Sequence, residues 1–79
     1  MTKQEKEWQM IFAASCIEAA ARRLNIDTQQ MYRRMKAVNM IDDFILKHYK
    51  TLHTMSREYV TDDIIECLNN WEQAKKTQS

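Results

Sequence analysis

The chain has 79 residues, of which 44% are apolar and 29% charged, and its formal net charge is +1. A chain of this length has room for one domain that buries roughly 60% of its unfolded surface. This composition is that of globular chains and excludes an intrinsically disordered one. The near-zero net charge also lacks the overall positive excess on which salt-dependent binding to DNA relies. We therefore expect a single folded domain over residues 1–79.

Glycine and proline are both absent from the sequence. These residues supply the positive-φ positions and rigid corners that hairpins and long loops need. Residues that favour helices, such as Ala, Met, Gln, Glu, Lys and Arg, are frequent instead. The composition predicts an all-α fold, a compact bundle of four helices around a long N-terminal helix.

The first helix is predicted from a capping box, in which Thr2 is followed three residues later by Glu5. Apolar residues then recur at four-residue intervals as far as Leu24, and others widen the stripe. Such a broad face predicts a central helix that contacts several neighbours. The residues expected to face the core are Trp8, Ile11, Phe12, Ala14, Cys16, Ile17, Ala20, Ala21 and Leu24.

Asn25 follows this stripe, and Asn is the residue that best replaces Gly where a helix ends in a left-handed residue. Asp27 and Gln30 have a second capping-box spacing, which predicts a short helix that ends between residues 37 and 39. Its expected buried residues are Met31, Met35 and Val38.

Asp42 and Asp43 are expected to open a third helix, since carboxylates favour the positive end of the helix dipole. Its buried face is expected to hold Ile41, Phe44, Ile45, Tyr49 and Leu52. A fourth helix should start at Ser56 or Thr61, with Val60, Ile64, Cys67, Leu68 and Trp71 inward. Residues 72–79 are almost wholly polar, so we expect a frayed tail there.

Nothing at the start resembles a secretory leader, and no apolar run approaches 18 residues. We therefore expect a cytoplasmic protein that does not bind membranes. Cys16 and Cys67 lie far apart within apolar stripes, which favours reduced thiols, with a disulfide as the alternative. Neither the cysteines nor His48 and His53 have the close spacing of a zinc site. No metal and no cofactor are expected.

The carboxylate pairs Asp42/Asp43 and Asp62/Asp63 could suggest acid-base catalysis, because facing carboxylates can drive their pKa values apart. Their position at helix starts explains them without catalysis. The sequence also contains no Gly-rich phosphate loop and no nucleophile elbow. We expect that the protein is not an enzyme.

Residues 22–36 hold five basic side chains against one acid. An alanine-rich helix, a Leu24-x-Ile26 corner and a basic second helix resemble a Fis-type helix-turn-helix, although Asn25 stands where such motifs usually have Gly. If the resemblance holds, this helix would contact bases or phosphates. The contact residues would be Gln29, Gln30, Arg33, Arg34 and Lys36.

A second pattern covers residues 49–65. Leu52-His53-Thr54 precedes Tyr59-Val60-Thr61-Asp62-Asp63-Ile64-Ile65. This resembles an uncharacterised family of short all-helical bacterial proteins with a Leu-His-Thr block ahead of a Tyr-(Ile/Val)-x-Asp-Asp-Ile-Ile helix. The resemblance implies a helical domain and hints at an accessory or antitoxin-like role beside toxin-like ADP-ribosyltransferase-fold proteins. Cys67 and Trp71 lie outside the pattern.

Within the Leu-His-Thr block, Leu52 would complete a buried helical face. His53 and Thr54 fall where the carbonyls at a helix end need donors, which favours a structural role over a ligand site.

Two functions therefore stay open. The first is an interaction module that binds another protein or a second copy of itself through exposed apolar side chains, because six Met and two Trp exceed what so small a core readily holds. The candidates are Trp8, Met10, Met40, Met55 and Trp71. The alternative is a dimeric helix-turn-helix regulator that binds DNA.

Overall fold

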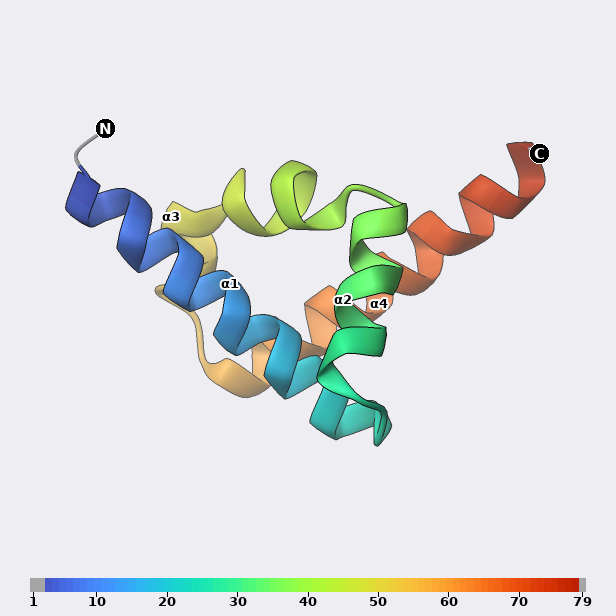
Figure 1. Cartoon of the computed structure of the whole chain (residues 1–79), viewed down its shortest axis with the longest axis horizontal. Coiled ribbons are helices and arrows are strands. Elements are labelled where there is room, and N and C mark those ends of the chain that lie inside the picture. Colours follow the sequence, from blue (N-terminus) through green and yellow to red (C-terminus); the bar gives the residue numbers. More distant parts are fainter. Residues whose placement is uncertain (1–2, 79) are drawn as a thin grey trace.

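The computed structural model describes residues 3–78 and is helical throughout, with no strand among those residues. The elements in chain order are α1 (Lys3–Leu24), α2 (Thr28–Ala37), the π-helix η1 (Ile41–Leu46), α3 (Tyr49–Leu52) and α4 (Arg57–Gln78). The predicted all-α fold is confirmed. The molecule measures 39 × 25 × 21 Å, and the start of α1 and the end of α4 project from opposite sides of it (Figure 1).

The corner between α1 and α2 forms as the sequence predicts. Asn25 has φ 56°, the left-handed conformation. The Ile26 N–H donates to the Ala21 carbonyl at 2.9 Å, and the Asn25 N–H donates to the Arg22 carbonyl at 3.2 Å. These two bonds make a Schellman motif, which satisfies carbonyls at the end of α1. Asp27 is the N-cap of α2 but makes no side-chain capping bond, so the predicted capping box with Gln30 is wrong.

The predicted third helix is divided. Asn39 has φ 56°, and the chain then enters η1, whose turns hold more residues than those of an α-helix. At His48 the backbone leaves helical geometry, with φ −105° and ψ 19°, before the short α3. The change in helical pitch alters which side chains face inward. Ile45 and Leu52 are fully buried as expected, whereas Ile41, Phe44 and Tyr49 are half-buried.

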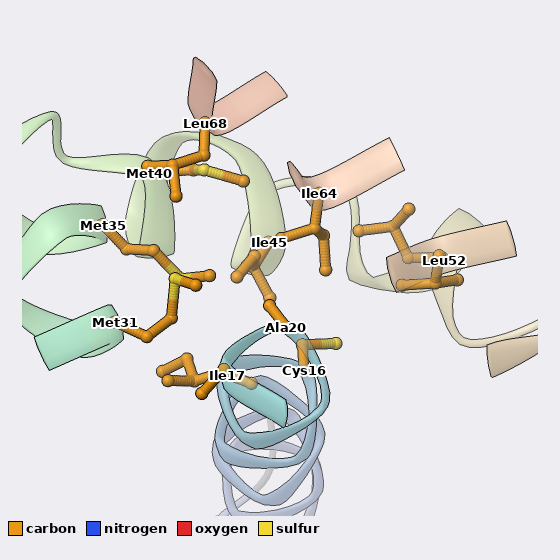
Figure 2. Packing of buried hydrophobic residues seen from close by; sticks show 13 residues of the cluster. Cys16, Ile17, Ala20, Met31, Met35, Met40, Ile45, Leu52, Ile64 and Leu68 are labelled. Carbon is orange, nitrogen blue, oxygen red and sulfur yellow. The ribbon is translucent and has the colours of Figure 1, made fainter. Parts of the chain in front are cut away.

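The core gathers side chains from all five helices (Figure 2). Three methionines, Met31, Met35 and Met40, are completely buried there, where a flexible thioether fills irregular gaps. From α1 the buried residues are Ala13, Cys16, Ile17, Ala20 and Ala21. The remaining core residues are Ile45, Leu52, Val60, Ile64 and Leu68.

Part of the predicted α1 face is wrong. Trp8, Ile11, Ala14 and Leu24 are exposed. The other helices pack on one side of α1, so apolar residues on its other sides stay uncovered. The side that packs on the core holds Phe12, Ala13, Cys16, Ile17, Ala20 and Ala21. Periodicity identified an apolar helix correctly but assigned too much of it to the core.

The start and end of α4 are both defined by contacts. Its first turn is capped by Ser56, whose hydroxyl accepts a hydrogen bond from the Tyr59 N–H at 3.2 Å, so the prediction of a start at Ser56 is confirmed. We predicted a frayed tail from residue 72, and the structure continues α4 to Gln78. Glu72 pairs with Arg34, and Lys75 donates from Nζ to the Ala37 carbonyl at 2.8 Å. The predicted N-terminal capping box involves Thr2, which lies outside the described residues.

Among residues 3–78, no helix combines the length and the apolar character needed to cross a membrane.

Candidate functional site

Three large apolar side chains that are exposed lie close together on α1, at Trp8, Met10 and Ile11. Residues 8–14 read Trp-Gln-Met-Ile-Phe-Ala-Ala, so this segment is apolar around most of its circumference. Trp8 is 55% exposed, Met10 55% and Ile11 59%. Phe12 alone of these four large side chains is half-buried, with its ring edge-to-face against Tyr49 at 5.3 Å. A helix that is apolar all round normally lies buried.

A shallow hollow of about 330 Å³ runs beside this segment, between α1, α2 and η1. Its floor is made of small and branched apolar side chains of α1, namely Ala13, Ala14 and Ile17. Its walls come from Met10, Tyr32 and Ile41, and Tyr32 is 43% exposed. The two consecutive alanines create the hollow, because a methyl group leaves room where the neighbouring positions carry larger side chains.

Charged residues stand at both ends of this apolar surface. Lys6 and Glu7 border Met10 and Ile11 at one end. Glu18 borders the hollow at the other end. We call Lys6, Met10, Ala14 and Glu18, with Ile11 beside them and Trp8 on the other side of the same turns, the α1 strip. An apolar centre with charged ends is the arrangement of a protein interface, whose rim is polar and whose centre is apolar.

The Leu-His-Thr block occupies the corner between α3 and α4. Leu52 is buried in the core. His53 stacks on Tyr49, with ring centroids 4.8 Å apart and planes 17° apart. The Thr54 hydroxyl donates to the Thr51 carbonyl at 2.7 Å. Each side chain therefore has a structural contact that fixes the end of α3.

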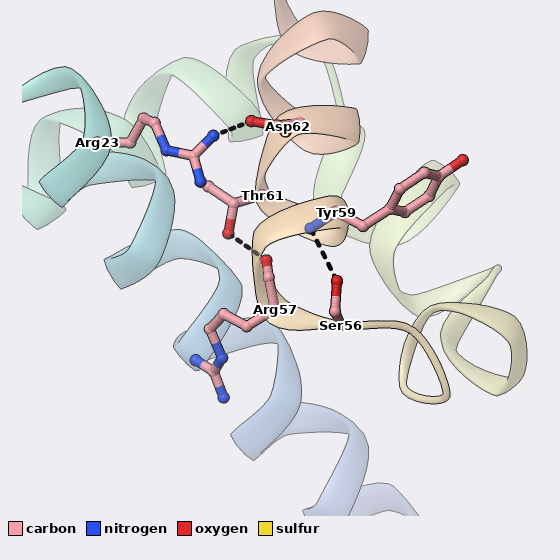
Figure 3. Close-up of polar contacts among 6 residues, drawn as sticks. All are labelled: Arg23, Ser56, Arg57, Tyr59, Thr61 and Asp62. Carbon is pink, nitrogen blue, oxygen red and sulfur yellow. Dashed lines mark hydrogen bonds and ion pairs between the residues drawn. The ribbon is translucent and has the colours of Figure 1, made fainter.

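The second part of the motif lies along α4 (Figure 3). Asp62 forms an ion pair with Arg23 of α1, and Thr61 donates from its hydroxyl to the Arg57 carbonyl at 2.8 Å. Asp63 is half-buried, and its charge helps to raise the pKa of Cys67. Tyr59 differs, because its ring is 58% exposed and points away from α1. The motif thus mainly joins α4 to the rest of the molecule.

Beside that corner lies a cavity of about 260 Å³ between α1 and the start of α4. Arg57 reaches across it and donates a hydrogen bond to the Ser15 hydroxyl. His53 and Cys16 also line it. Burial raises the pKa of the Cys16 thiol to about 11, despite the opposing charge of Arg57. A thiol with so high a pKa is a poor nucleophile near neutral pH.

The predicted nucleic-acid contacts all lie on α2, and two of their three cations contact other side chains. Arg34 is bonded to Glu72 through Nε at 3.0 Å and Nη2 at 2.8 Å. Lys36 lies over the Tyr32 ring at 5.8 Å. Gln29 borders the apolar hollow. Gln30 and Arg33 are exposed.

Of the apolar residues predicted to contact a partner, some are exposed and others are buried. Trp8, Met10 and Met55 are exposed, with Met55 at 38%. Met40 is completely buried, so its assignment to the surface is wrong. Trp71 is half-buried and makes an edge-to-face contact with Phe44 at 6.2 Å.

Sequence reasoning missed two features of this surface. Ile11 and Ala14 were assigned to the core although they belong to the α1 strip. A signal was present, since residues 8–14 are apolar on more sides than one core can cover. The hollow against Tyr32 and Ile41 has no sequence signal, because it depends on how α2 and η1 pack beside α1.

Comparison with known proteins identifies one relationship. A family model described as protein of unknown function (DUF3791) matches residues 11–71. No curated protein matches the chain, and no solved structure does. The match covers the α1–α2 corner, the Leu-His-Thr block and most of α4, and it begins at Ile11 within the α1 strip.

Proposed function

The chain belongs to the DUF3791 family, and we propose that it is a non-enzymatic interaction module that docks onto a polypeptide through the α1 strip. The observation that carries this proposal is the exposure of Trp8, Met10 and Ile11, each more than half accessible on one short segment. Burying side chains of this size contributes about 1.5–3 kcal/mol each. When a partner covers three such side chains, their burial contributes favourable free energy to binding.

The total surface supports the same conclusion. The accessible surface is 5728 Å² for a chain of 9.5 kDa. Folded monomers of that mass expose about 5,000 Å² by the usual scaling with mass. The excess of about 700 Å² accompanies an elongated shape in which the start of α1 and the end of α4 both project, so the start of α1 has area that a partner can cover. On α1, the exposed apolar side chains Trp8, Met10 and Ile11 lie in this projecting part.

Several observations favour docking over catalysis. The side chains of the Leu-His-Thr block and of Asp62 are engaged in contacts that hold α3 and α4 in place. Burial raises the pKa of Cys16 and of Cys67 to about 11, which suppresses thiolate chemistry. An accessory or antitoxin-like subunit, the role implied by the sequence resemblance, needs a docking surface of this kind and no active site of its own.

Site-specific photo-crosslinking in cells of the organism whose genome encodes the protein tests this proposal. A photoreactive amino acid at position 10 should give covalent adducts with a polypeptide. The same group at position 50, where Lys50 is also exposed but lies on α3, is the matched control. Adducts no more abundant from position 10 than from position 50 would overturn the proposal. Mass spectrometry of the adduct identifies the partner.

DNA binding through α2 is a second proposal, and the exposure of Gln30 and Arg33 favours it. It has less support, because Glu72 neutralises Arg34 and the apolar hollow occupies the side of α2 that carries Gln29 and Tyr32. A mobility-shift titration with duplex DNA at low ionic strength is decisive. Binding that weakens in R33A and loses part of its salt dependence would support a DNA-binding role, and no shift at low salt would end it.

A further inference from the structure

We propose that the partner at the α1 strip is a second copy of this chain, with the two α1 helices paired antiparallel about a two-fold axis midway between Met10 and Ala14. This inference rests on the proposed function, that the α1 strip is an interface, and adds the identity of the occupant. It is argued from the order of four side chains along one ridge of α1.

Lys6, Met10, Ala14 and Glu18 follow one another at intervals of four residues. Residues at this interval lie one above another on the same side of an α-helix. All four are exposed. Lys6 and Met10 border one hollow of the surface, and Met10, Ala14 and Glu18 border the next, so the four form a continuous row.

The order of this row makes it complementary to itself. Read from the N-terminus, the side chains are a cation, a large apolar group, a small apolar group and an anion. When two such rows run antiparallel, residues whose numbers add up to 24 face each other. Lys6 then meets Glu18 of the second copy, and Met10 meets Ala14 of the second copy. Because the axis is two-fold, each contact occurs twice.

The hollow beside α1 provides space for this packing. Met10 of the second copy would enter the depression over Ala14, between Tyr32 and Ile41. A large side chain fitted into a depression between facing helices is the general mode of helix packing. Alanine at the contact also permits the two backbones to approach closely. Ile11, which borders the same hollow as Lys6 and Met10, would cover the outer edge of the interface.

The charge order along the row favours a second copy over other partners. The ends of the row carry opposite charges, so an identical row in the antiparallel direction neutralises both. A partner of uniform charge would leave either Lys6 or Glu18 facing a like charge.

Reversing the charge of Lys6 or Glu18 tests the two-fold arrangement, because that arrangement predicts which charge each of them faces. K6E places a second carboxylate opposite Glu18 at both ends of the interface, and E18K places a second ammonium group opposite Lys6. Each variant alone should weaken dimerisation by about tenfold or more, since two ion pairs become like-charge pairs. An equimolar mixture of K6E and E18K should restore dimers, because every facing pair is then opposite in sign. The double variant K6E/E18K should dimerise like the unmodified chain.

Sedimentation equilibrium over a concentration series measures these associations, and circular dichroism verifies that each variant is folded. Lys50 and Glu66 are exposed charges outside the strip, so K50E and E66K are matched controls that should dimerise normally. A14E, which puts a charge opposite Met10 of the second copy, should abolish dimers without loss of helix. A mixture of K6E and E18K that associates no better than either variant alone would overturn the antiparallel arrangement.

The experiments distinguish failure of the second-copy proposal from failure of the proposed function. A purified chain that stays monomeric at every concentration overturns the second-copy proposal. If position 10 nevertheless crosslinks to a different polypeptide in cells, the α1 strip is an interface with another partner and the proposed function stands. If the purified chain dimerises and the position-10 adduct has twice the mass of the chain, both proposals are supported.

Discussion

Arg34 of α2 holds both carboxylate oxygens of Glu72 of α4, with Nε 3.0 Å from Oε2 and Nη2 2.8 Å from Oε1. The two side chains are 31% and 28% exposed, so water only partly screens them. A fork of two parallel charge-assisted hydrogen bonds is stronger and more directional than an ordinary surface ion pair. Together with the bond from Lys75 to the Ala37 carbonyl, it attaches the last turns of α4 to α2.

Breaking this pair should destabilise the fold modestly. We expect R34A to lower the free energy of unfolding by about 1 kcal/mol, at the upper end for a partly exposed pair. In a domain of this size that corresponds to a fall in Tm of about 4–8 °C. R33A, which removes an exposed neighbouring arginine, is the control and should change Tm little. The swapped variant R34E/E72R should recover part of the loss, and a swap no better than R34A would show that the pair does not stabilise the fold.

The same pair predicts a dependence of stability on pH. The hydrogen bond from Arg34 lowers the pKa of Glu72 below its ordinary value of 4.5. A carboxyl whose folded pKa is depressed stabilises the fold above the unfolded pKa, and that contribution is lost as the pH falls through the folded pKa. Urea unfolding should therefore show a steeper loss of stability below about pH 4.5 in the unmodified chain than in E72Q. Parallel pH profiles for the two proteins would contradict this.

The left-handed residue at the end of α1 is a further point of test. Asn25 has φ 56°, which costs a residue with a β-carbon about 1 kcal/mol relative to glycine, less for asparagine. We expect N25A to be less stable than the unmodified chain and N25G to be at least as stable, measured by chemical denaturation. If N25A and N25G were equally stable, the left-handed conformation at position 25 would not favour glycine over alanine, which would contradict this prediction.

Thiol labelling tests the state of the cysteines. The pKa values of Cys16 and Cys67 are both raised by burial to about 11. At pH 8 such thiols are about 0.1% ionised, roughly a hundredfold less than at the ordinary value of 9.0. Ellman's reagent should therefore react far more slowly with the folded chain than with the chain in urea. One thiol per folded chain that reacts at the unfolded rate would contradict this prediction.

The sequence by itself determined the local structure. Without glycine, proline or turn pairs the chain could only be helical, and Asn25 marked the end of the first helix because asparagine tolerates a positive φ better than the residues around it. Ser56 was one of two predicted starts for the fourth helix, with Thr61, and it caps α4. The Leu-His-Thr block and the Tyr-Val-x-Asp-Asp-Ile-Ile helix indicated an uncharacterised family, and the chain belongs to DUF3791. These features depend on residues close together in the chain.

Only the tertiary structure decided what covers each helix. Trp8 and Ile11 follow the same apolar periodicity as Cys16 and Ile17, although only the latter two are buried. The periodicity of the sequence carries no information on where the neighbouring helices pack. The division of the third helix at His48, and the pairing of Arg34 with a glutamate 38 residues away, also depend on contacts between distant parts of the chain. Sequence patterns predicted which residues are apolar. Packing determined which of them remain in water, among them the apolar residues of the α1 strip.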